Sequence, residues 1–209
     1  MIVDAYLATA RVAATLLREP GIGHHWTDVS ALPEYRISGL AGHLAMSVFR
    51  VAQWLDEPVP AEVEPVDAVT YFASSYRPGP SPHEPAHQRL RGYAEEVAGE
   101  GQDDLVGRVD ATLDELAATL PTLSPERRVF ANRAALRLDE WLVTRMIELA
   151  VHMDDLAVSI DVETPRLPGE AADIVLSTLV RIAAAQYGEV PVLRALSRRE
   201  RAAVTISAF

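Results

Sequence analysis

Apolar residues recur at every third or fourth position through most of this chain, and clusters of proline and glycine separate the periodic segments. This spacing places apolar side chains on one face of a helix, so it predicts helices that pack face to face. Proline lacks the N–H that a helix interior requires, and the proline and glycine clusters therefore indicate where helices end. We expect helices at about residues 2–18, 38–57, 66–76, 86–119, 138–160 and 169–187.

Four principal helices followed by an appended C-terminal segment predict a mainly α fold, a four-helix bundle with a short C-terminal helical extension. Gly99 and Gly101 are candidate interruptions of the longest helix, and Pro191 could open one more short helix. Residues 127–138 are ambiguous and could hold a short extended piece. Residues 202–209 alternate weakly between apolar and polar, which suggests a terminal strand.

The composition excludes several classes of protein. The formal net charge of −11 repels phosphate, so we expect neither nucleic acid nor an anionic membrane as a partner. No apolar stretch approaches the ~20 residues that span a bilayer, and the N-terminus lacks the pattern of a signal peptide. We therefore expect a soluble, cytoplasmic protein. The chain has no Cys, so any metal must be held by His, Asp or Glu, and any thiol chemistry requires an external thiol.

The helix expected at 138–160 carries a polar stripe beside its apolar one. Glu148 and His152 lie four residues apart, so their side chains share one face and can bind a single ion. Helical bundles build metal sites from such pairs. The same stripe also fits a solvated face, on which Arg145 and Glu148 would form an ordinary surface ion pair. Trp141 is unusual for a solvated face, and the helix is apolar around most of its circumference.

Two segments carry a resemblance to a known family. The segment RISGLAGHLAMSVFRV, which contains His43, and the segment WLVTRMIELAVHMDDLAVSID, which contains Glu148 and His152, resemble helices of the DinB-like superfamily. They are most similar to the mycothiol-dependent maleylpyruvate isomerase family. The resemblance implies a DinB-like bundle over residues 1–162 with a short C-terminal extension over 163–209. It also implies that His43, Glu148 and His152 are the metal ligands.

The neighbours of these ligands are candidate catalytic residues. Arg145 lies one turn before Glu148 and could hold a substrate carboxylate, orient Glu148, or form a structural ion pair. Asp155 lies three residues after His152 and could accept the second N–H of its imidazole ring. We therefore expect Arg145 and Asp155 beside the metal, in a role that the sequence does not decide.

The other histidines give weaker signals. His83 and His87 match the HExxH pattern of zinc proteases, in which both histidines lie in one continuous helix. Pro85 is tolerated only near the start of a helix, and a start there would place His83 outside it. A protease is therefore disfavoured. His24 and His25 fall in an expected loop that could border the site or simply face solvent.

Three N and O ligands leave a coordination position open, as in catalytic rather than structural sites. The ligand set suits Zn²⁺ and admits Ni²⁺, Fe²⁺ or Mn²⁺. The resemblance implies mycothiol as the thiol, and hence an isomerase or S-transferase that acts on a small electrophilic substrate through a metal-bound thiolate. Two alternatives stay open: a metal-dependent hydrolase of a small amide or ester, and a metal-free bundle without enzymatic activity. A homodimer is also compatible with broad apolar faces.

Overall fold

The computed structural model describes residues 1–75, 85–202 and 205–208, and it is dominated by helices. The helices of the described residues form in the order α1 (Ile2–Leu16), α2 (Pro20–His24), α3 (Ile37–Leu55), α4 (Ala68–Ser75), α5 (Pro85–Ala98), α6 (Gln102–Thr119), α7 (Leu138–Ser159), α8 (Ala171–Tyr187) and α9 (Glu189–Ser197), with 3-10 turns η1 (Leu120–Thr122) and η2 (Arg199–Arg201). The expected mainly α, DinB-like fold is confirmed.

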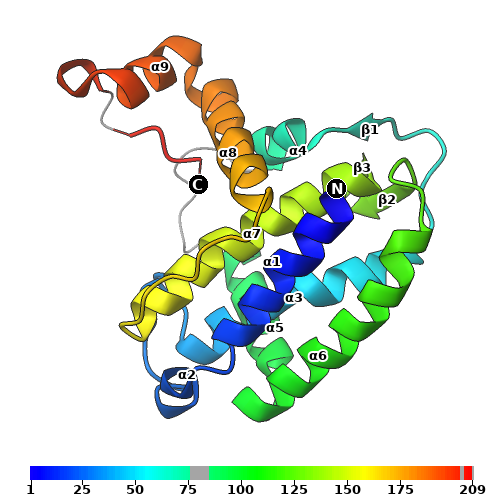
Figure 1. Ribbon diagram of the computed structural model, residues 1–209, viewed down its shortest axis with the longest axis vertical. Helices are drawn as coiled ribbons and strands as arrows, with labels where there is room; N and C mark the ends of the chain where they lie inside the picture. The colour runs from blue at the N-terminus through cyan, green and yellow to red at the C-terminus, as the bar shows by residue number, and fades with distance from the viewer. Residues whose placement is uncertain (76–84, 203–204, 209) are drawn as a thin grey trace.

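Helices α1, α3, α6 and α7 form the bundle. Their apolar stripes meet in one continuous core, because α1 and α3 both pack against α7 while α6 packs against α1 and α3. Helix α5 lies along the other side of α3. Helix α8 contacts α4 and α7, and α9 extends from it beyond the bundle (Figure 1). Within the described residues, no helix is long and apolar enough to cross a membrane.

A small sheet precedes α7, with β1 (Pro65–Val66), β2 (Arg128–Ala131) and β3 (Ala134–Arg137) in the order β1-β3-β2. Strands β2 and β3 form an antiparallel hairpin, in which Val129 pairs with Leu136, and β1 joins β3 in parallel. Asn132 and Arg133 make the two-residue turn with φ values of 48° and 70°, the left-handed conformation that a tight hairpin favours. The extended piece expected in residues 127–138 is therefore this hairpin.

Three expected boundaries differ from the structure. The helix expected at 86–119 is two helices, because Gly99 and Gly101 adopt φ values of +71° and +149° that helices do not contain. The loop expected after residue 20 begins with α2 instead, since proline is compatible with the first position of a helix. Helix α4 begins at Ala68 rather than at residue 66, which pairs in β1.

The terminal strand expected in residues 202–209 is wrong for the part that the structure describes. Residues 205–208 have no strand conformation. In Figure 1 residues 205–208 lie away from the small sheet, whose edge strands could otherwise pair with a strand through backbone hydrogen bonds. The Ala208 carbonyl instead accepts a hydrogen bond of 3.3 Å from Gln186 Nε2.

A close crossing of α3 and α5 fixes the position of the helix that carries His43. A Cβ atom on Gly42 would lie 2.1 Å from the backbone oxygen of Ala94 and 2.9 Å from the backbone nitrogen of Ala98. Only glycine permits this approach without displacing one helix, because the contacted atoms are backbone and cannot move aside. The position of α3 in the bundle thus depends on Gly42.

We predict that Gly42→Ala lowers the free energy of unfolding by about 1–3 kcal/mol, as overpacked core substitutions do. Gly107→Ala is the matched control, since Gly107 lies within α6 and a Cβ there meets nothing within 4 Å. The control should be neutral or stabilise by up to about 1 kcal/mol, because alanine favours helix more than glycine does. Urea unfolding followed by circular dichroism measures both values, and equal stabilisation by the two substitutions would contradict the close crossing.

Candidate metal centre

The polar stripe of α7 faces the interior of the bundle. Trp141 is 0% exposed and Arg145 is 4% exposed. The side chains of Glu148 and His152 are each 13% exposed, and that of Asp155 is 26% exposed. A solvated face would leave most of these side chains in water. The structure therefore excludes ordinary surface decoration as the explanation of the stripe.

Packing of α3 against α7 brings His43 to the same place. The rings of His43 and His152 lie with their centroids 4.4 Å apart and meet edge to face at 79°. One potential ligand atom from each of His43, Glu148 and His152 lies within 4.8 Å of the other two. The three residues named from the sequence are thus brought together, and their binding of a metal stays a prediction.

Two carboxylates hold the imidazole of His152. Its Nδ1 lies 2.9 Å from Oδ2 of Asp155, and its Nε2 lies 3.2 Å from Oε2 of Glu148. Burial lowers the pKa of His152, but the hydrogen bonds to the two carboxylates outweigh it and raise the pKa to about 9. Without a metal, His152 is therefore a cation held between Asp155 and Glu148.

The pKa values of Glu148 and His43, by contrast, are lowered. Burial raises the pKa of Glu148, but the hydrogen bond from His152 and the charge of Arg145 bring it down to about 2. Burial lowers the pKa of His43 to about 3, and the nearby charge of His152 contributes to this shift. At neutral pH the metal-free centre thus contains an ionised Glu148, a charged His152 and a neutral His43.

The side chain of Arg145 is buried next to the candidate ligands rather than exposed at the surface. Its Cζ atom sits 4.1 Å from the ring centroid of Trp141, and its Nε donates a hydrogen bond of 3.1 Å to Oγ1 of Thr144. A terminal nitrogen lies 3.7 Å from Oε1 of Glu148. These contacts favour a role in orienting Glu148 over a role at the surface.

The side chains fit a divalent ion. Nδ1 of His43 is buried and has no hydrogen-bond partner among the described residues, and a neutral imidazole retains a lone pair for a metal. Asp155 accepts a hydrogen bond from Nδ1 of His152, so that Nε2, which lies beside Glu148, is the ring nitrogen that a metal could bind once its proton is lost. Two imidazoles and one carboxylate match the ligand set of known catalytic sites for Zn²⁺.

The remaining histidines lie away from this centre or outside the described residues. His83 is outside them, so the HExxH pattern is not tested there, and His87 lies in the first turn of α5 (Pro85–Ala98). His24 lies in the last turn of α2. Nδ1 of His25 pairs with Oδ2 of Asp28 at 2.8 Å, and the His25 side chain is 56% exposed.

Two neighbours of the centre were not selected from the sequence. The ring of Tyr35 lies 5.5 Å from that of His43, and burial raises the pKa of Tyr35 to about 12. Tyr35 precedes α3 in an irregular segment, where no periodicity points to it. Arg50 lies two turns after His43 on the same face of α3, and helical spacing alone could have suggested it.

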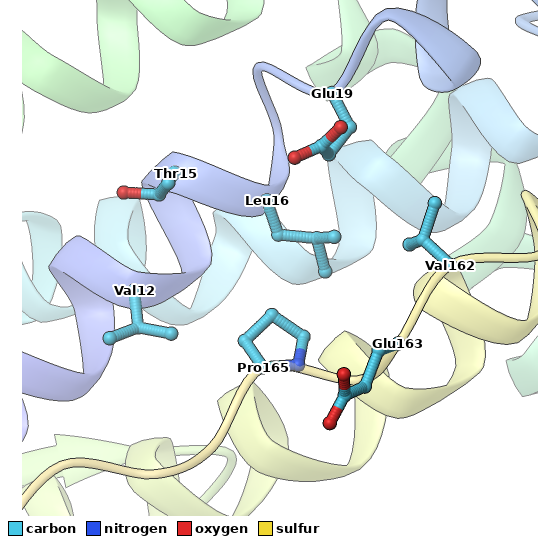
Figure 2. A pocket seen from close by; sticks show the side chains of 7 residues that line it. All are labelled: Val12, Thr15, Leu16, Glu19, Val162, Glu163 and Pro165. Atoms are coloured by element: carbon cyan, nitrogen blue, oxygen red, sulfur yellow. The ribbon is translucent and has the colours of Figure 1, made fainter.

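Two surface hollows of the described residues lie apart from the three candidate ligands. One, of about 380 Å³, lies between α1 and the segment after α7, and Figure 2 shows Leu16 and Pro165 pointing into it. The other, of about 550 Å³, lies at the C-terminal end of α7 and includes Ser159 in its lining. The side chains of the candidate metal centre therefore line neither hollow.

The fold and this cluster define a helical-bundle protein with a buried His–Glu–His centre. Residues 7–157 match the family model described as the mycothiol maleylpyruvate isomerase N-terminal domain, and the chain belongs to this family. The crystal structure of the mycothiol-dependent maleylpyruvate isomerase is similar, with a TM-score of 0.51 and 16% identity over 85% of this chain and 68% of that one. A comparison with curated proteins gives no match.

Binding of a divalent ion should release the proton on His152. Near neutral pH His152 is charged in the metal-free protein, since its pKa is about 9, whereas His43 and Glu148 have already lost their protons. A ligating imidazole must be neutral, so we predict release of about one proton per Zn²⁺ and an apparent affinity that rises about tenfold per pH unit up to about pH 9. Calorimetry in buffers of different ionisation enthalpy measures this release.

The variant Asp155→Asn provides the comparison for this prediction. It removes a carboxylate that stabilises the charged ring of His152, so it should lower the pKa of His152 and reduce proton release near neutral pH. A wild-type affinity that is independent of pH, with no proton release, would contradict the prediction.

Proposed function

We propose that this protein is a metal- and thiol-dependent isomerase or S-transferase, acting on a small electrophilic substrate. His43, Glu148 and His152 hold the metal, with Zn²⁺ the preferred ion and mycothiol the thiol. The observation that carries the proposal is the position of the buried cluster inside the segment that matches the mycothiol maleylpyruvate isomerase N-terminal domain family. The neighbouring structure is a mycothiol-dependent maleylpyruvate isomerase, which supports the same class.

The donor set supports Zn²⁺ as the ion. Imidazole nitrogen and carboxylate oxygen are common ligands of Zn²⁺, and three protein ligands leave a position for a further ligand. When bound, the ion would lower the pKa of a coordinated thiol, so that the thiolate forms near neutral pH. The same ligands also admit Ni²⁺, Fe²⁺ or Mn²⁺.

The protein's own side chains prepare the centre for this ion. Asp155 holds the proton at Nδ1 of His152, which fixes the ring orientation and leaves Nε2 toward Glu148. The hydrogen bond from His152 and the charge of Arg145 keep Glu148 ionised. Because these side chains are largely buried, water competes little for the carboxylate and imidazole groups.

The thiol must come from outside the chain, which contains no Cys. A thiolate adds to an activated carbon–carbon double bond, which becomes a single bond about which the adduct rotates. Loss of the thiol restores the double bond in the other geometry, and this sequence is cis–trans isomerisation. Retention of the thiol, with a proton added to the neighbouring carbon, gives a conjugate and constitutes S-transfer.

We also propose that the chain consists of two parts with different roles. Residues 1–162 form the DinB-like bundle that contains all three proposed ligands, and residues 163–209 form a short helical extension. The family match over residues 7–157 ends just before this boundary. The packing of α8 on α4 and α7 attaches the extension to the bundle.

Cobalt substitution tests metal and thiol together. We predict that protein purified without a His tag holds about one Co²⁺ per chain, and that added mycothiol produces a thiolate-to-cobalt charge-transfer band in the near ultraviolet. His152→Ala should lose the ion and the band, because the remaining ligands bind too weakly. His24→Ala is the matched control, since His24 is exposed in the last turn of α2, and it should behave as the wild type.

Two results would contradict the proposal. Less than about a tenth of an equivalent of metal, unchanged by His152→Ala, would exclude the metal centre. A full equivalent of Co²⁺ whose spectrum does not respond to mycothiol would exclude thiol dependence and leave the metal.

A further inference from the structure

The two helices of the C-terminal extension carry apolar side chains that the bundle does not cover. On α8, Leu176 and Val180 lie four residues apart, so they share one side of the helix. On α9, Val190, Leu193 and Leu196 recur every third residue and also share one side. These five side chains are between 40% and 65% exposed. Single exposed apolar residues are ordinary on a protein surface, whereas a gathered set of them indicates an interaction site.

Neither helix uses these side chains to attach to the bundle. Helix α8 packs on α4 and α7, and its buried residues include Val175 and Ile182. Helix α9 packs on α8, extends beyond the bundle (Figure 1) and has Val192 as its one buried residue. The described residues therefore leave an apolar surface uncovered on two adjoining helices. We define this α8–α9 face by Leu176, Val180, Val190, Leu193 and Leu196.

The charged residues beside the α8–α9 face differ in sign at its two ends. Asp173 is exposed and lies one turn before Leu176, in the first turn of α8. Arg194 is exposed and follows Leu193 in the last turn of α9. Two more exposed arginines come directly after α9, and they are Arg198 and Arg199. The face is therefore acidic at the α8 end and basic at the α9 end.

The extension as a whole also differs in charge from the bundle. Residues 1–162 contain 13 Arg and 25 Asp and Glu, whereas residues 163–209 contain 6 Arg and 5 Asp and Glu. Two arginines of the extension have acidic partners within the chain: Arg181 pairs with Asp67 at 3.6 Å, and Arg201 pairs with Glu200 at 3.7 Å. Arg194 has no ion pair within the described residues, so it remains available to an acidic group of another molecule.

We propose that the α8–α9 face is the interface of a two-fold symmetric dimer of this chain. In a two-fold interface the same surface of each copy meets the other, so the acidic end of one copy lies against the basic end of its partner. Asp173 of one copy then faces Arg194 of the partner subunit, and Leu176 packs on Leu193 of the partner subunit. This arrangement covers both apolar surfaces and makes the charges around them complementary.

A second copy fits this surface better than a membrane does. Anionic lipid would attract the arginines at the α9 end, but it would repel Asp173 and the acidic bundle. A standard protein interface uses roughly 20–30 residues from each partner. Helices α8 and α9 have 17 and 9 residues, and their exposed sides provide fewer than that. We therefore expect a reversible dimer that dissociates on dilution.

Sedimentation velocity of the whole chain over a concentration series tests the interface. Wild type should change from monomer to dimer as its concentration rises through the micromolar range. Leu193→Glu should weaken the dimer by at least about tenfold, because the substitution occurs twice in the dimer and places a charge among apolar groups. Val158→Glu is the matched control, since Val158 is comparably exposed on α7 outside the face, and it should dimerise as wild type does. Circular dichroism checks that both variants keep their helices.

Charge reversal tests the two-fold arrangement at low ionic strength, where surface charges interact most strongly. Asp173→Arg and Arg194→Asp should each weaken self-association by about tenfold, because each places like charges together twice. An equimolar mixture of the two variants should recover the wild-type affinity. In the mixed dimer each of the two contacts joins an arginine to an aspartate, whereas neither variant can form such a contact with itself.

Wild type that stays monomeric throughout the series would overturn the proposal. A dimer that Leu193→Glu leaves intact would overturn it as well, and so would a mixture of the two charge variants that stays monomeric. Monomeric wild type that binds vesicles of phosphatidylcholine and phosphatidylglycerol, when Leu193→Glu does not, would assign the face to a membrane instead. None of these measurements requires a bound metal, so the interface and the proposed metal-dependent function can fail separately.

Discussion

The burial of the Glu148 carboxylate is the constraint on which the centre depends. An ionised carboxylate inside a bundle is strongly destabilising unless charged or polar groups compensate it. Arg145 and His152 approach its two oxygens, and Asp155 in turn holds His152. In the metal-free protein the His152 proton supplies the balancing charge, and in the proposed function a divalent ion takes the place of that proton. The same network therefore stabilises the fold and prepares the ligands.

The surrounding helices provide the rigidity that this network requires. Gly42 allows α3 to approach the backbone of α5 closely, which places His43 opposite α7. The Arg145 guanidinium packs on the ring of Trp141, and Trp54 on α3 packs against the same indole. The polar groups thus lie between two helices whose relative position is fixed by apolar and backbone contacts.

Helical periodicity predicted the bundle well because each long helix carries an apolar face that packs in the core. It also placed Glu148 and His152 on one side of α7, but it could not decide whether that side was covered. Burial is a property of the neighbouring helices, and no local pattern contains it. His43 was identified as a candidate ligand only through the family resemblance, because it lies on another helix and reaches the site through long-range packing. Arg50 was not selected, although its helical spacing from His43 could have suggested it, and the alternation in residues 205–208 was misleading.

A crystal structure of the zinc-loaded protein, with anomalous data collected on both sides of the zinc absorption edge, tests the central claim most directly. We predict one strong anomalous peak between α3 and α7, roughly 2.0–2.2 Å from a ring nitrogen of His43, a carboxylate oxygen of Glu148 and Nε2 of His152. A map without a peak there, in which Glu148 and His152 keep the direct ion pair of the metal-free protein, would contradict the account.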